Sequence, residues 1–127
     1  MKANDLYSQE AKSRWPKEYE ISNTKLSSLT KAEQVELFQI GNRNIKQVAM
    51  AFLSNQSAGS IEVQKLVSEH YQWICNFWKP NQDAYIGLGK MYVEDPRFAQ
   101  NYESLASGCA EFMCNAMKIY AQEHLSN

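Results

Sequence analysis

The chain has 127 residues with 13 basic and 14 acidic side chains, which give a formal net charge of −1. This length suits one domain. The five glycines and three prolines are too few for the many tight turns of an all-β sandwich or barrel, so the composition predicts an all-α domain. A near-neutral charge makes the phosphate backbone of nucleic acids a poor default partner.

The apolar runs and the cysteines predict a cytoplasmic protein without membrane contact. Every apolar run is far shorter than the ~18 residues of a spanning helix, and no apolar signal-peptide core follows Met1. Cys75, Cys109 and Cys114 are an odd number and lack the spacing of a metal site. This pattern is typical of a reducing compartment.

The beginning of the chain is polar and is interrupted at Trp15-Pro16, because proline disfavours helical geometry in the residue before it. Short helices are expected over residues 5–14 and 17–21. Their bulky apolar side chains are Leu6, Trp15, Tyr19 and Ile21. These bury too little surface to hold the segment firmly. We therefore expect a mobile segment over residues 1–22 and a helical domain over residues 23–127.

A long helix is predicted from Thr30 to about Ser54. Thr30 and Glu33 have the capping-box spacing, in which each side chain accepts a hydrogen bond from the other residue's backbone N–H. Apolar side chains then recur at helical spacing. They are Val35, Leu37, Phe38, Ile40, Ile45, Val48, Ala49, Phe52 and Leu53.

The next helix is predicted to begin after Ser60, a suitable N-cap residue, and to end before Lys79-Pro80. Its expected inward face consists of Val63, Leu66, Val67, His70, Ile74 and Phe77.

Three more helices are predicted in the last third of the chain. A helix over residues 82–93 contains Gly87 and Gly89, which indicate a close backbone approach because each costs about 1 kcal/mol in a helix. Asp95 is expected to cap a short helix with Pro96 in its first position. A last helix is expected over residues 105–124.

His70 is the one histidine in an apolar stripe, and it has two interpretations. It could be a metal or haem ligand or a general base, or it could be a hydrogen-bonded histidine at a core edge or pocket wall. No carboxylate or second histidine lies three or four positions from it, and metal sites need several converging donors. The hydrogen-bonded histidine is therefore favoured. Because no cysteine pairs with a histidine at helical spacing, and the adjacent Glu94 and Asp95 suit a helix end, we predict no catalytic residue, metal or cofactor.

Aromatic side chains are concentrated between Tyr71 and Tyr102. Helically spaced aromatic residues usually form a core, but this set exceeds what one stripe can bury. It comprises Tyr71, Trp73, Phe77, Trp78, Tyr85 and Tyr92. An aromatic-walled cleft for a flat or macrocyclic ligand is the alternative to a plain core.

Residues 88–98 read Leu-Gly-Lys-Met-Tyr-Val-Glu-Asp-Pro-Arg-Phe and resemble the L-G-x-M-Y-V-x-D-x-R-F signature of TipAS-type antibiotic-recognition domains. Residues 10–15, the helix that contains His70, and residues 108–112 are similar to the same family. The resemblance extends over roughly residues 7–120.

The resemblance implies a compact, globin-like all-α fold that binds no haem. Members commonly form the effector domain of MerR-type transcription regulators, also occur alone, and bind bulky multi-ring peptide antibiotics in a cleft. In some members the N-terminal segment becomes ordered when ligand arrives, which would make residues 1–22 a lid. Stripe geometry and the resemblance together predict a binding site of His70, Trp73, Phe77, Trp78, Tyr85, Met91 and Tyr92, with Trp15 and Tyr19 from the lid.

One position departs from the family pattern. Members that trap thiopeptides covalently carry a cysteine directly before the L-G-x-M-Y motif, where this chain has Gly87. Covalent capture by that route is therefore not expected.

The sequence thus predicts a non-enzymatic domain that binds bulky hydrophobic multi-ring peptide antibiotics, for transcriptional sensing or for sequestration and resistance, without itself contacting nucleic acid. A fused MerR-type DNA-binding domain and a homodimer both stay open. The alternatives are a protein-interaction or dimerisation module with no small-molecule ligand, and a cofactor protein with a haem pocket around His70.

Overall fold

The computed structural model describes residues 29–127, and in this part of the chain all regular structure is helical. The helices are α3 (Lys31–Leu53), α4 (Ile61–Ile74), α5 (Gln82–Glu94), α6 (Pro96–Glu103) and α7 (Cys109–His124). The all-α prediction is confirmed. The helices expected over residues 5–14 and 17–21, and the mobile segment expected over residues 1–22, lie outside the described residues. Among residues 29–127, no helix combines the length and low polarity that a bilayer crossing needs.

The predicted N-terminal caps are present in the structure. The Thr30 hydroxyl accepts a hydrogen bond from the Glu33 backbone N–H at 3.1 Å, and the Glu33 carboxylate accepts one from the Thr30 N–H at 3.0 Å. The side chains of Ser60 and Asp95 accept from backbone N–H groups in the first turns of α4 and α6. Pro96 occupies the first turn of α6, as predicted. These local signals define where the helices begin because they satisfy N–H groups that have no partner within the helix.

The end of α4 differs from the prediction. The helix ends at Ile74 instead of continuing through Phe77. The Phe77 backbone N–H donates to the Ile74 carbonyl at 2.8 Å, and the Asn76 side chain donates to the Trp73 carbonyl at 3.1 Å. These bonds tighten the chain into a turn and satisfy carbonyls at the helix end. Phe77 and Trp78 therefore lie in the connection between α4 and α5.

The start of α7 also differs. The helix begins at Cys109 and not near Leu105, because Gly108 has a φ of 90°, in the left-handed region that interrupts a right-handed helix and favours glycine. Glu103, the last residue of α6, accepts hydrogen bonds from the backbone N–H groups of Gly108 and Ala110 at 3.0 and 2.9 Å. A carboxylate from the preceding helix thus caps α7.

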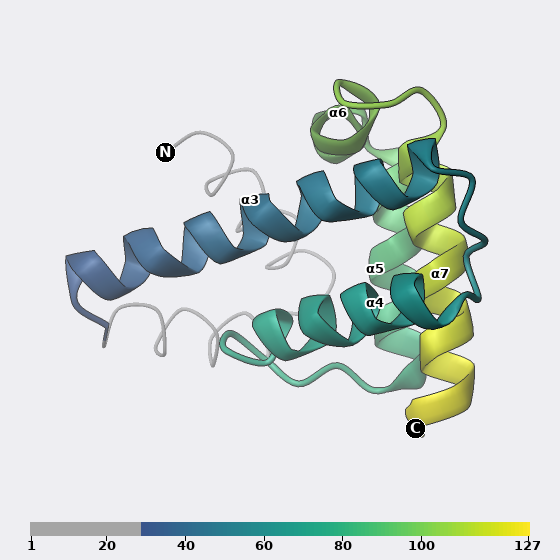
Figure 1. Ribbon diagram of the computed structural model, residues 1–127. Coiled ribbons are helices and arrows are strands. Elements are labelled where there is room, and N and C mark those ends of the chain that lie inside the picture. Colours follow the sequence, from purple (N-terminus) through teal and green to yellow (C-terminus); the bar gives the residue numbers. More distant parts are fainter. Residues whose placement is uncertain (1–28) are drawn as a thin grey trace.

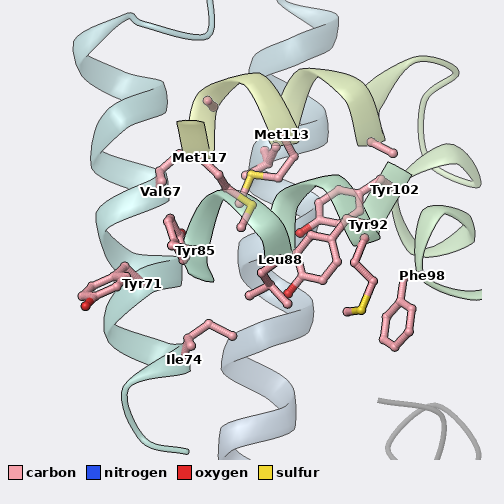
Figure 2. Close-up of a cluster of buried hydrophobic side chains, with 14 of the residues drawn as sticks. Val67, Tyr71, Ile74, Tyr85, Leu88, Tyr92, Phe98, Tyr102, Met113 and Met117 are labelled. Atoms are coloured by element: carbon pink, nitrogen blue, oxygen red, sulfur yellow. The ribbon is translucent and has the colours of Figure 1, made fainter. Parts of the chain in front are cut away.

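The helices form two antiparallel pairs, α3 with α4 and α5 with α7, and the pairs cross each other with α6 at one end (Figure 1). Leu88 on α5 and Met113 and Met117 on α7 are fully buried in the core (Figure 2). A Cβ atom at Gly89 would lie 3.4 Å from the Cα atom of Cys114. The predicted close backbone approach is therefore confirmed at Gly89, where α5 meets α7.

The N-terminal half of α3 extends beyond this core (Figure 1). No residue from 31 to 40 is buried. Val35, Ile40 and Leu53, which were expected on the inward face, are 48%, 38% and 64% exposed. The predicted stripe is wrong at its two ends, because α3 is longer than the helices it packs on and buries residues only from Gly41 onward.

The cap of α7 makes stability depend on the Glu103 carboxylate. Its two backbone hydrogen bonds lower the pKa of Glu103 below its usual value of 4.5. The cap therefore contributes its full stabilisation above pH 4.5 and loses it as the pH falls through the lowered pKa of the folded state. We expect Glu103→Gln to lower the melting temperature at pH 7, with a smaller difference from the wild type in strong acid. The exposed Glu69→Gln is the control, and equal melting temperatures for both variants at pH 7 would contradict the cap.

Candidate functional site

His70 on α4 is buried and is held by two tyrosines of α5. Its Nδ1 atom lies 2.7 Å from the Tyr85 hydroxyl, and its Nε2 atom lies 3.3 Å from the Tyr92 hydroxyl. A neutral imidazole has one N–H donor and one acceptor nitrogen. One tyrosine hydroxyl therefore donates to the ring and the other accepts from it. The accepting hydroxyl keeps its own proton, which points away from His70.

Burial keeps His70 neutral. The side chain is 3% exposed, and desolvation lowers its pKa from 6.5 to about 3. Both ring nitrogens are engaged by hydroxyl groups, which compensates for the loss of water. The prediction of a hydrogen-bonded histidine is confirmed.

Aromatic rings surround this histidine. The ring centroids of Trp73, Tyr85 and Tyr92 lie 6.0, 5.7 and 5.9 Å from that of His70. The network continues from Tyr92 to Phe98, which stack at 6.2 Å, and from Trp73 to Phe77, which meet edge to face at 5.2 Å. Figure 2 shows Tyr92 and Phe98 close together at one side of the core. Tilted and edge-to-face pairs of this kind are favourable beyond the area they bury.

Trp73 joins α4 to α3. Its indole N–H donates to the Leu37 carbonyl at 2.7 Å. The same indole lies directly on Gly41, where an added Cβ atom would lie 2.7 Å from the Trp73 Cζ2 atom. Only glycine leaves room for the indole at this position of α3.

The structure brings together most of the predicted site residues but leaves little of their surface exposed. Those that it buries are His70, Phe77, Trp78, Tyr85, Met91 and Tyr92, and Trp73 is half-buried. Trp15 and Tyr19 lie outside the described residues. Tyr85 and Met91 have no exposed surface. Tyr85 and Met91 can therefore act only as packing partners within the core, whereas Trp73 has exposed surface that a ligand can contact.

Sequence reasoning missed two buried residues of α3, Gly41 and Asn44. The Asn44 side-chain N–H donates to the Leu66 carbonyl at 2.9 Å, and its Oδ1 atom is buried without a hydrogen-bond partner in the part of the chain that the structure describes. Neither residue is apolar, so a search for apolar periodicity passes over both. Their spacing from the buried Val48, at i−7 and i−4, is the signal that places them on the same face.

The three cysteines are free. Burial raises the pKa of Cys109 to about 11 and also raises the pKa of Cys114, so these thiols stay protonated at neutral pH. Among residues 29–127, no three His, Cys, Asp or Glu side chains are grouped as a metal site would require.

These features define an all-α domain built around a cluster of aromatic rings. The family follows from a comparison with protein-family models, in which residues 7–120 match the TipAS antibiotic-recognition domain. The chain belongs to this family, as the resemblance predicted.

A solved structure gives the same fold. TipAS of Streptomyces lividans, in complex with nosiheptide and described as part of a thiopeptide antibiotic multidrug resistance system, matches with a TM-score of 0.80 and 26% identity over 94% of this chain and 86% of that chain. The fold is therefore all-α and globin-like, as predicted.

The HTH-type transcriptional regulator SkgA of Caulobacter vibrioides is similar in sequence, in two strains of that species. It is 31% identical over 77 residues, which are 59% of this chain and 30% of SkgA. The match thus spans about 30% of the regulator's length.

Burial of neutral His70 makes the protein less stable in acid. Below pH 6.5 the unfolded chain takes up a proton at this residue, whereas the folded chain does not until about pH 3. The free energy of unfolding should therefore fall by about 1.4 kcal/mol per pH unit as the pH decreases below 6.5. Urea unfolding between pH 7 and pH 5.5 measures this slope, because most carboxylates are ionised in both the folded and the unfolded chain over that range. In His70→Gln the dependence of the unfolding free energy on pH should be smaller by the contribution of about one proton. An unchanged dependence would show that His70 is not the group responsible.

The contact between Gly41 and Trp73 can be tested by adding one methyl group. Gly41→Ala gains about 1 kcal/mol of helix propensity but forces the indole off α3, at a strain of about 1–3 kcal/mol. We expect a lower melting temperature and a red shift of tryptophan fluorescence, because the Trp73 N–H loses the Leu37 carbonyl. Gly59→Ala is the control, since a Cβ atom there makes an ordinary contact with Ile119 at 3.7 Å. A Gly41→Ala spectrum like that of the wild type would rule out the close contact.

Proposed function

We propose that this chain is a non-enzymatic antibiotic-binding domain that recognises bulky, hydrophobic, multi-ring peptide antibiotics of the thiopeptide kind. The observation that carries the proposal is the match of nearly the whole chain to a TipAS domain whose solved structure contains nosiheptide. The aromatic cluster supports it, because flat apolar rings suit ligands built from several rings.

The proposed contact surface centres on the C-terminal end of α4 and the connection that follows it. Trp73, Phe77 and Trp78 come from this region, and Tyr92 comes from α5. The buried His70 contacts Trp73 and Tyr92 from the core side and is itself held by Tyr85, while Met91 is part of the core beneath the proposed surface. By the family resemblance, Trp15 and Tyr19 of the segment 1–22 would close over the ligand as a lid.

We propose that binding is reversible. Gly87 occupies the position at which covalently trapping members carry a cysteine, and the raised pKa values of Cys109 and Cys114 disfavour the nucleophilic thiolate. Antibiotic should therefore leave the protein on dialysis under denaturing conditions.

His70 argues against enzymatic and haem-binding alternatives. A general base or an axial haem ligand needs a free nitrogen lone pair, whereas both ring nitrogens of His70 are engaged by tyrosine hydroxyls in the core.

The relation to SkgA supports a role in transcriptional sensing through a fused DNA-binding domain, in which this chain would be the cytoplasmic effector part. Sequestration of the drug uses the same binding surface.

A protein-interaction module is the second candidate, and one observation favours it. Met50, Leu53 and Ile61 are 67%, 64% and 90% exposed around the α3–α4 connection. Exposed apolar side chains that gather on one surface are a feature of protein contacts. This candidate predicts a stable dimer in light scattering and no response to antibiotics.

The proposed function predicts that nosiheptide raises the melting temperature in proportion to the logarithm of its excess concentration and gives a saturable calorimetric titration. Trp73→Ala should weaken binding at least tenfold, or about 1.4 kcal/mol, because Trp73 combines exposed surface with a place in the aromatic cluster. Ile61→Ala removes an exposed apolar side chain elsewhere and is the control. No binding of nosiheptide or other thiopeptides by the wild type would overturn the proposed function.

A further inference from the structure

Asn44 is a buried polar side chain with one atom that no group among residues 29–127 satisfies. The residue is 5% exposed and lies on the face of α3 that packs against α4. Its Nδ2 atom donates to the Leu66 carbonyl at 2.9 Å, while its Oδ1 atom is buried without a hydrogen-bond partner. A buried acceptor without a donor costs folding free energy. A hydrogen-bond donor brought to this oxygen by another molecule would remove that cost.

The orientation of this amide is determined by its surroundings. Rotating the Asn44 side chain to exchange its oxygen and nitrogen would place two oxygen atoms against each other, Oδ1 and the Leu66 carbonyl. The Nδ2 donor therefore stays on Leu66, and Oδ1 remains the atom that needs a donor.

The position of Asn44 places it beside the proposed contact surface. From the exposed N-terminal end of α3, the first buried residue is Gly41, and Asn44 is the first that carries a buried side chain. Gly41 is covered by the half-buried Trp73, and the Leu66 carbonyl lies one helical turn before His70 on α4. Asn44 therefore lies one helical turn along α3 from the Gly41–Trp73 contact, and a ligand group would have to enter between α3 and α4 beside Trp73 to reach its oxygen.

We infer that Asn44 is a specificity-determining residue whose Oδ1 atom accepts a hydrogen bond from an N–H or O–H group of the ligand. This inference rests on the proposed function and adds the polar group that the ligand must present. A peptide antibiotic supplies such donors as backbone amide N–H groups, which the aromatic rings around the site do not recognise. Ligands with a donor at this point are favoured over ligands without one, because only they form a hydrogen bond with an oxygen that is unpaired in the free protein.

The test replaces the amide with an apolar side chain of similar size. Asn44→Leu should lower the affinity for nosiheptide at least tenfold in calorimetry. The change removes the unpaired acceptor and also the Nδ2–Leu66 hydrogen bond, so the melting temperature of the free protein is measured alongside and binding is compared at a temperature at which both proteins are folded. Asn42→Leu makes the same change at an exposed position of α3 and should leave the affinity unchanged.

A second measurement needs no variant. In wild-type protein labelled with ¹³Cγ-asparagine, saturation with nosiheptide should shift the Asn44 carbonyl resonance downfield, as acceptance of a new hydrogen bond requires, and leave that of Asn42 in place. An unchanged Asn44 resonance, or equal affinity of Asn44→Leu and the wild type, overturns the role of Asn44 while the proposed function stands. If the wild type binds no thiopeptide, both fail together.

Discussion

The rest of the structure depends on the burial of a neutral histidine between two tyrosine hydroxyls. An imidazole removed from water is tolerated only when its nitrogens find hydrogen-bond partners. Tyr85 and Tyr92, seven residues apart on one face of α5, supply both. This requirement sets how α4 lies against α5, and the rings that pack around His70 exclude water from it. The same burial depresses the pKa of His70 to about 3, so the arrangement stays uncharged at physiological pH.

Polar contacts add to the apolar packing that holds α3 in place. Trp73 donates to a carbonyl of α3, and Asn44 donates to a carbonyl of α4, so each helix of the pair binds the other's backbone. Gly41 permits this by leaving the space that the indole fills. Aromatic surface and a small number of oriented polar atoms therefore lie together on α4, between its contacts with α3 and those with the tyrosines of α5. For a recognition domain, this combination offers broad apolar contact together with selectivity for hydrogen-bonding groups.

Local signals predicted where α3, α4 and α6 begin, whereas contacts between helices decided where α7 begins and which residues of each helix are buried. Each N-cap side chain bonds a backbone N–H no more than three residues away, so the helix start can be predicted from the local sequence. This holds for Thr30, Ser60 and Asp95. The turn before α7 instead depends on Gly108 together with a carboxylate from another helix. The apolar pattern of α3 extended to residues that no neighbour covers.

The sequence by itself determined the all-α class, the TipAS family and the hydrogen-bonded state expected of His70, because helix periodicity, a long motif and residue chemistry are all local properties. Only the tertiary structure decided which of the predicted site residues keep exposed surface and which are buried. It also brought Asn44 and Gly41 of α3 against α4, a pairing across more than twenty residues that no local pattern encodes. Burial depends on how whole helices meet, and that geometry arises from the packing of the complete core.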